Sequence, residues 1–148
     1  MYKNDTTTHV YQNEWQRLRT NIRKTEAWLR TNINEFLSQF EITHQQLTIL
    51  RILRDANNEP ISTKEIGTKM MDKNSDVSRL VDRLVDKGLV RKRKSTTDGR
   101  LVQVSINYEG LKILAKIDDH KQDLDQRFSL LSEDEAEQLN FLLEKARS

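Results

Sequence analysis

One stretch of this chain, residues 74–99, joins the pattern of an amphipathic helix to a run of four consecutive cations. Apolar side chains recur in it at three- and four-residue spacing, so they share one helix face and leave polar and charged groups on the other. These apolar residues are Val77, Leu80, Val81, Leu84 and Val85. Ser75 can cap the start of the helix, and Gly88 stands where a helix end favours a residue that tolerates positive φ. The pattern predicts a short helix with one buried face and one polar face.

A basic β-hairpin is predicted directly after this helix. Residues 90–94 read Val-Arg-Lys-Arg-Lys, Asp98-Gly99 is a strong hairpin-turn signal, and residues 101–106 supply the returning strand. Such a helix fits the major groove of duplex DNA, while the hairpin follows the backbone with its tip at the minor groove. The alternative is a core helix followed by a surface hairpin whose lysines only increase solubility.

The distribution of charge favours the DNA hypothesis. Residues 73–100 hold nine Lys or Arg against four Asp or Glu, whereas residues 109–148 hold six against ten. A local basic segment beside an acidic tail indicates one anionic partner at one place on the molecule.

A long N-terminal helix is predicted by apolar residues that follow a heptad pattern from Tyr11 to Phe40. A helix of this length needs a partner for its apolar seam, and we expect that partner to be partly the C-terminal region and partly a second copy of the chain. Trp15 and Trp28 lie on this helix. They can pack in the core or dimer interface, or they can line a ligand pocket; aromatic residues at helical spacing favour the first.

Two shorter helices are expected between the long helix and residue 74. Thr43 and Gln46 form a capping box at the first, and Ser62 and Glu65 form a second box. Residues 57–60, Asn-Asn-Glu-Pro, predict a turn between them. The helix opened by Ser62 and the helix after residue 74 are joined by a tight turn, which indicates a helix-turn-helix that the basic hairpin makes winged.

Two further helices are predicted at the C-terminal end. Asn107 can cap a long helix whose apolar stripe continues through residues 118–120 to Leu131. Ser132 and Glu135 form a capping box at the last helix. The residues that this last helix is expected to bury are Leu139, Leu142, Leu143 and Ala146.

Several function classes are not supported by the sequence. The chain has 148 residues, which favours one domain, and no cysteine, which excludes disulfides and thiolate metal sites. The three histidines are not in a metal-ligand motif, the four glycines form no nucleotide loop, and no nucleophile–base pair stands out. A zinc site completed by carboxylates is the remaining alternative. We expect no enzyme, cofactor or metal, and, without an apolar span or signal peptide, a cytoplasmic protein with no membrane partner.

Residues 77–90, Val-Ser-Arg-Leu-Val-Asp-Arg-Leu-Val-Asp-Lys-Gly-Leu-Val, resemble the recognition helix of the MarR family of winged-helix regulators. Residues 98–107 resemble the wing signature of that family, Asp-x-Arg followed by alternating apolar residues and a helix cap. Gly110 fits the glycine usual at the next helix start, and the order of helices is similar over nearly the whole chain. The chain departs from the family at Asn107, often threonine, at Asn74, commonly proline, and in lacking the cysteine of the peroxide-sensing branch.

The resemblance implies a mainly α fold with a small β-hairpin wing, in one domain spanning residues 1–148. Residues 10–40 and 108–148 would form the dimerisation helices, and residues 43–107 the winged-helix DNA-binding lobe. A homodimer would read a pseudo-palindromic operator with half-sites ~10 bp apart. Members of the family are most often repressors that a small aromatic or anionic ligand releases from DNA.

The resemblance and the residue chemistry together nominate DNA contacts. Arg100 resembles the arginine that reaches the minor groove from the wing in this family. Asp98 resembles its acidic partner, or it is simply a turn residue. The candidates for the major groove are Ser75, Asp76, Ser78, Arg79 and Arg83. Arg79 or Arg83 can instead bind phosphate or pair with Asp82.

The remaining candidate DNA contacts are directed at phosphates. Ser62, Thr63 and Lys64 open a helix, where free backbone N–H groups attract phosphate. Lys92 and Lys94 are expected to contact phosphate from the hairpin. Arg91 and Arg93 alternate with them, and we expect them to point the other way and pair with acidic residues.

Candidate effector-binding residues are Trp15, Arg19, Trp28 and His44, at the expected junction of the dimer helices and the lobe. Two alternatives to a sequence-specific regulator remain: a winged-helix protein-interaction module that meets an acidic protein, and a non-specific architectural DNA-binding protein. The ratio of specific to non-specific DNA affinity discriminates among them.

Overall fold

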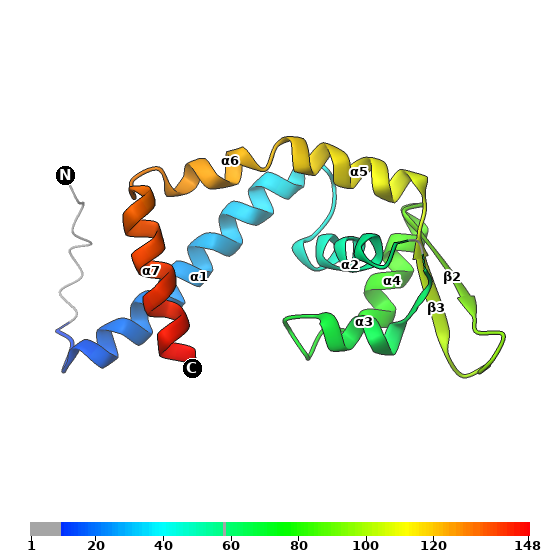
Figure 1. The fold of residues 1–148 in the computed structure, drawn as a ribbon, viewed down its shortest axis with the longest axis horizontal. Helices are drawn as coiled ribbons and strands as arrows, with labels where there is room; N and C mark the ends of the chain where they lie inside the picture. The colour runs from blue at the N-terminus through cyan, green and yellow to red at the C-terminus, as the bar shows by residue number, and fades with distance from the viewer. Residues whose placement is uncertain (1–9, 58) are drawn as a thin grey trace.

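The computed structural model describes residues 10–57 and 59–148, in which a helical arm extends from a lobe that contains a small sheet (Figure 1). The fold is mainly α-helical, as predicted. The elements are α1 (Glu14–Ser38), α2 (His44–Asp55), β1 (Ile61–Ser62), α3 (Thr63–Lys69), α4 (Val77–Asp86), β2 (Val90–Lys94), β3 (Val102–Ile106), α5 (Tyr108–Asp119), α6 (Gln122–Asp125), a 3-10 helix (Gln126–Phe128) and α7 (Glu133–Arg147).

Helix α1 forms the arm, and α7 crosses it near its N-terminal end (Figure 1). The helix begins three residues later than expected from Tyr11, because the Asn13 side chain accepts a hydrogen bond from the Gln16 backbone N–H at 2.9 Å and so caps residue 14. Only its last turns reach the core, where Phe36 and Leu37 are buried. The predicted apolar seam is therefore largely unburied within one chain.

The hydrophobic core lies in the lobe. Its buried apolar residues all fall between Phe36 and Ile117, and α2 contributes most heavily. The predicted capping box of α2 is confirmed in both directions: the Gln46 N–H donates to the Thr43 hydroxyl at 3.2 Å, and the Thr43 N–H donates to the Gln46 side chain at 3.0 Å. The cap fixes where α2 starts and hence which of its faces enters the core.

The sheet has three antiparallel strands in the order β1-β3-β2. The hairpin of β2 and β3 is confirmed, while β1 was not predicted because two residues are too few to show a period. Residues 95–101 connect β2 to β3, so the turn is longer than Asp98-Gly99 alone, and β3 starts at Val102. The loop is closed by hydrogen bonds from the Ser95 N–H to the Leu101 carbonyl, 2.8 Å, and from the Leu101 N–H to the Asp98 carbonyl, 3.0 Å.

The helix predicted from residue 108 to residue 131 is wrong as a single element. Asn107 caps α5 as expected, by accepting from the Gly110 N–H at 3.0 Å, but α5 ends at Asp119. Nδ1 of His120 lies 2.8 Å from the Lys116 carbonyl, the group to which the His120 N–H would donate in a continuing helix. That N–H turns to the Ile117 carbonyl at 3.1 Å instead, which ends α5.

The capping box of α7 is confirmed, with the Glu135 N–H donating to the Ser132 hydroxyl at 3.2 Å. The residues that α7 was expected to bury are not buried in one chain, since Leu139 and Leu142 are 44% and 51% exposed. The turn at residues 57–60 begins at Asn57, which has a positive φ of 52°; Asn58 lies outside the described residues. Among the described helices, none has both the length and the apolar character needed to span a membrane.

Candidate nucleic-acid interface

Helix α4 places a row of polar side chains on the surface of the lobe. Its buried face consists of Leu80, Val81 and Leu84, as its spacing predicted, and Gly88 ends it with a φ of 72°. Ser78, Arg79, Asp82 and Arg83 are exposed on the opposite face. The sequence therefore located both faces of this helix correctly.

The predicted cap of α4 is wrong. The Asp76 carboxylate caps the helix by accepting from the Arg79 N–H at 3.1 Å, and Asp76 also lies 3.7 Å from Nε of Arg79. Ser75 is half-buried, and its hydroxyl accepts a hydrogen bond from Nε2 of Gln45 on α2 at 3.2 Å. Asp76 therefore fixes the first turn of α4 and one of its arginines, while Ser75 joins α4 to α2.

Helix α3 precedes α4 in the helix-turn-helix and starts at the sheet. The Ser62 hydroxyl caps it by accepting from the Glu65 N–H at 3.0 Å. The expected reciprocal half of this box is absent from the described contacts of Glu65, whose carboxylate lies 3.9 Å from Nζ of Lys69. Thr63 is half-buried and Lys64 is exposed, so the lysine is the group that extends from this helix start into solvent.

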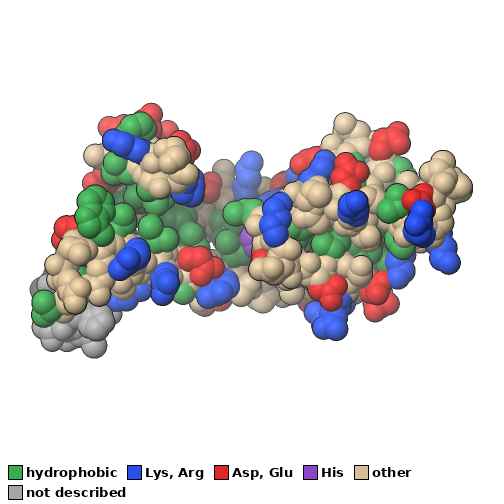
Figure 2. All heavy atoms as spheres, turned by 90° about the horizontal axis from the view of Figure 1, so that it is seen from below, with side chains coloured by type: hydrophobic (Ala, Val, Ile, Leu, Met, Phe, Trp, Pro, Cys, Tyr) green, Lys and Arg blue, Asp and Glu red, His purple; other side chains and the backbone are tan. Residues whose placement is uncertain are grey.

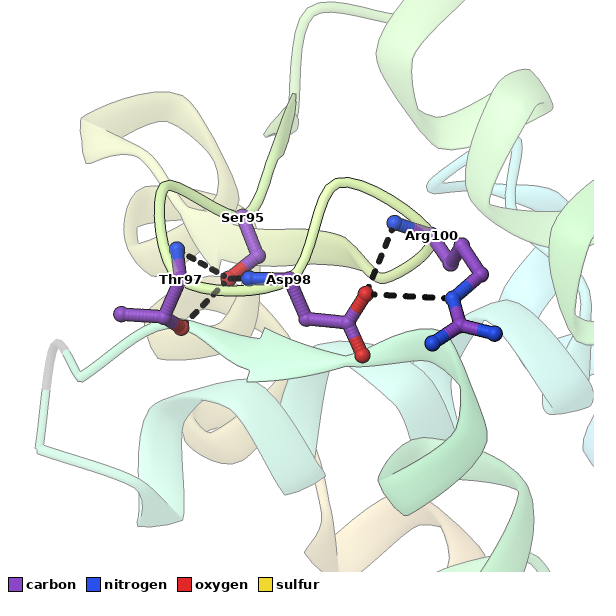
Figure 3. Close-up of polar contacts among 4 residues, drawn as sticks. All are labelled: Ser95, Thr97, Asp98 and Arg100. Atoms are coloured by element: carbon purple, nitrogen blue, oxygen red, sulfur yellow. Dashed lines mark hydrogen bonds and ion pairs between the residues drawn. The ribbon is translucent and has the colours of Figure 1, made fainter.

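The loop between β2 and β3 is held by its own side chains (Figure 3). The Ser95 hydroxyl accepts from the backbone N–H groups of Thr97 and Asp98, each at 3.3 Å. Oδ1 of Asp98 accepts from the Arg100 N–H at 3.1 Å and lies 3.6 Å from Nε of Arg100. The Arg100 side chain is nevertheless 94% exposed, so Asp98 both shapes the loop and steadies a guanidinium that extends from it.

The strand β2 carries its cations on two faces of the sheet, but their pairing is the reverse of the prediction. Lys92 forms an ion pair with Asp82 on α4. Arg91 and Arg93, which were expected to pair with acidic residues, form no ion pair with any residue in 10–57 or 59–148. Pairing of Arg79 or Arg83 with Asp82 was one alternative that the sequence left open, and the described ion-pair partner of Asp82 is Lys92.

The four candidate effector residues do not come together in one chain. Trp15 and Trp28 stand 13 positions apart on α1, which separates them by about 20 Å along the helix. Arg19 lines a hollow of about 350 Å³ with other residues of α1, and Trp28 packs edge-on against Phe128 with 5.2 Å between ring centroids. His44 begins α2, where partial desolvation, and to a lesser extent the charge of Arg51, lowers the pKa of its imidazole below its usual value and so favours the neutral form.

The surface as a whole is suited to a polyanion. Exposed cations extend from α3, α4, β2 and the loop after β2. In Figure 2 Lys and Arg side chains are spread over both the lobe and the arm, and hydrophobic side chains gather on the arm. The described residues include no group of three His, Asp or Glu placed to hold a metal ion.

Comparison with known proteins gives consistent matches. A model of the MarR family matches residues 42–102. The chain is 32% identical over 114 residues to the HTH-type transcriptional repressor IacR of Pseudomonas putida, covering 76% of this chain and 67% of that protein. It is 25% identical over 118 residues to the HTH-type transcriptional regulator MhqR of Bacillus subtilis, covering 79% and 80% respectively.

A solved structure shows the same similarity over almost the full length. It is a mutant of MarR from Escherichia coli in complex with operator DNA, with a TM-score of 0.78 and 30% sequence identity. The match covers 90% of this chain and 96% of that one. The similarity to that structure therefore spans both arm and lobe, and the two relatives above are named a transcriptional repressor and a transcriptional regulator.

Proposed function

This chain belongs to the MarR family and is a DNA-binding transcriptional regulator; from that premise we propose that it is a homodimeric repressor of a pseudo-palindromic operator, released by a small ligand. The observation that carries the proposal is that α4, the start of α3 and the β2–β3 loop all present exposed cations. A relative with 30% sequence identity and the same fold is bound to operator DNA.

The dimer is supported by the apolar surface of the arm. Trp15, Leu18 and Ile22 on α1 are 74%, 42% and 44% exposed, and Leu139 and Leu142 on α7 are similarly open. Figure 2 shows hydrophobic side chains gathered along the arm, at the end of the molecule away from the sheet. A contiguous apolar patch of this kind is costly in water, and a second copy that brings the same patch covers it by two-fold symmetry.

In such a dimer two copies of α4 face one side of the assembly. We assign Ser78, Arg79 and Arg83 to the major groove, because guanidinium forks match the two acceptors of guanine. Lys64 and Lys94 are assigned to phosphates, and Arg100 to the minor groove beside the same half-site. Bound across a promoter, the dimer would exclude polymerase, which makes repression the simplest outcome, and the relative IacR is named a repressor.

Release by a ligand follows from the same geometry. The two α4 helices reach successive major grooves only at one spacing, and the arm sets that spacing. A small aromatic or anionic molecule can bind more tightly to an arrangement of arm and lobe that does not fit DNA. It would then lower operator affinity, at most by the ratio of its own affinities for the two arrangements.

The test is fluorescence anisotropy with DNA from upstream of the chain's own gene, compared with a scrambled duplex at near-physiological salt. A dimeric repressor should bind the upstream DNA at least roughly 10³-fold more tightly, with two chains per site. Equal binding to both duplexes would favour an architectural protein, and no binding to either would favour a protein-interaction module; both results contradict the proposal.

A further inference from the structure

The sheet has one face in the core and one face open to solvent. Strand alternation puts Ile61, Val90 and Val104 on the buried side. The register pairs Arg91 with Ser105 and Arg93 with Gln103, so these four side chains share the other side. We call the outer sheet face the surface formed by Pro60, Arg91, Arg93, Gln103 and Ser105.

The outer sheet face surrounds a hollow of about 460 Å³, which Lys92 also borders. No Asp or Glu lines this hollow. Glu59 precedes Pro60 in the sequence, but within the described part of the chain it forms no ion pair with either arginine. The side chains of Gln103 and Ser105 likewise have no hydrogen-bond partner among the described residues.

This surface therefore holds two guanidinium groups on positions about 7 Å apart along one strand, with an amide and a hydroxyl beside them. Like charges at that spacing repel each other, and an anion between them removes the repulsion. Arginine forks bind phosphate oxygens in pairs, and the amide N–H and hydroxyl can donate to the oxygens left over. The chemistry matches a phosphate group.

The position of the outer sheet face identifies the source of that phosphate. The hairpin lies at the end of the lobe farthest from α7 and the start of α1 (Figure 1). In a dimer joined through the arms, the two hairpins are then the outermost elements, and DNA that leaves a half-site runs outward past them. Lys and Arg side chains reach this outer end of the lobe in Figure 2.

We propose that the outer sheet face binds the phosphate backbone of DNA that flanks the operator, through Arg91 and Arg93 with Gln103 and Ser105. This inference rests on the proposed function, and it adds a contact that lies outside the half-sites. It implies that affinity depends on the length of the DNA as well as on its sequence.

The experiment uses the upstream DNA segment that the full-length protein binds, prepared as a duplex of roughly 20 bp that holds only the two half-sites and as one of roughly 40 bp with natural flanks. The wild-type protein should bind the longer duplex several-fold more tightly. The double variant R91Q/R93Q should lose this advantage, and its slope of log K against log salt on the longer duplex should fall by up to about 2.

The matched control is K112Q/K116Q, which removes the same charge from exposed positions of α5, across the lobe from α3 (Figure 1). It should retain the length advantage. An advantage that survives in R91Q/R93Q, or equal loss on both duplexes, would overturn the flanking contact while leaving operator binding itself intact. Failure of the wild-type protein to bind either duplex specifically would instead refute the proposed function.

Discussion

At the scale of single residues, three of the cations that we nominate as DNA contacts each lie beside an aspartate. Arg79 is 3.7 Å from Asp76, Arg100 is 3.6 Å from Asp98, and Lys92 pairs with Asp82. Exposed pairs of this type contribute only ~0.2–1 kcal/mol, so a phosphate can displace the carboxylate at little cost. Until then the carboxylate competes with DNA phosphate for the cation, which lowers affinity for any DNA.

Asp82→Asn tests this competition. Release of Lys92 should raise affinity for a scrambled duplex about two- to fivefold and steepen the slope of log K against log salt by ~0.9, because one more cation is available to phosphate. Both quantities come from anisotropy titrations over a range of salt. Asp86→Asn makes the same charge change on α4 at an exposed residue with no described ion pair, so it should have far less effect. Equal changes in the two variants would show that total charge, not the Lys92 pair, sets non-specific affinity.

Arg100→Ala should weaken operator binding by about tenfold or more, since it removes the one fully extended guanidinium of the loop after β2. Size-exclusion chromatography should show an unchanged oligomer, because the loop is remote from the arm. Thr96→Ala, at an exposed position in the same loop, controls for a disturbed loop and should bind as the wild type does. Unchanged affinity in the Arg100 variant would remove Arg100 from the interface.

At the scale of elements, local signals predicted the caps of α2, α5 and α7 correctly, since each cap and its partner lie within one turn. The boxes at Thr43 and Ser132 and the cap at Asn107 needed no tertiary information, and each starts its helix where expected. The cap of α4 could not be predicted this way. Ser75 and Asp76 are equally good caps by residue type, and the choice depends on Gln45, a contact 30 residues away that engages Ser75.

The same distinction explains the candidate site. The two faces of α4 follow from spacing, so the polar row was located correctly. The ion pairs of the β2 cations were not predicted correctly, because alternation shows only which residues share a face. The carboxylate that pairs with Lys92 belongs to Asp82 on α4, a different element. The break after Asp119 was missed since the apolar stripe of α5 resumes in α6, and a ring-to-backbone contact leaves no mark on periodicity.

The start of α5 packs tightly on the turn after α4. The side chain of Asn107 donates to the Gly88 carbonyl at 2.7 Å, and its backbone N–H donates to the Leu89 carbonyl at 3.2 Å. A Cβ on Gly110 would lie 2.6 Å from Cγ1 of Ile106 and still closer to the Leu89 carbonyl oxygen. Backbone cannot easily move away, so only glycine fits at this position.

Gly110→Ala should therefore lower the free energy of unfolding by roughly 1–3 kcal/mol, measured by urea titration followed by circular dichroism. Gly67→Ala is the matched control inside α3. Its added Cβ would meet only Cγ2 of Val77 at 3.7 Å, and the gain in helix propensity should stabilise by ~0.5–1 kcal/mol. Equal stability of the Gly110 variant and the wild type would mean that α5 can move away from the hairpin freely.

At the scale of the whole molecule, stability is distributed unevenly. The buried apolar residues of the described chain all fall between Phe36 and Ile117, so α1 contributes only its last turns and α7 contributes none. Within the arm, Trp28 meets Phe128 and Arg127 lies 3.9 Å from Glu35, which are contacts of modest strength. In the dimer that we propose, contacts with the second chain therefore contribute most of the stability of the arm.

Leu142→Asp should shift the protein from dimer to monomer and abolish cooperative operator binding, because it puts a carboxylate into the apolar face of α7. Sedimentation velocity over a range of concentration measures the shift. Asn140→Asp adds the same charge to the opposite side of α7 and should leave the dimer intact. A Leu142 variant that stays dimeric would place the interface elsewhere.

The open apolar face of the arm also has a consequence for dosage in the cell. If two chains must bury each other's apolar arm, promoter occupancy depends on the concentration of dimers and not on that of single chains. Where most chains are unpaired, the number of pairs follows the square of the total, so halving synthesis leaves roughly a quarter of them. The exposed leucines and tryptophans of the arm would thus make promoter occupancy depend more steeply on protein concentration than any single DNA contact could.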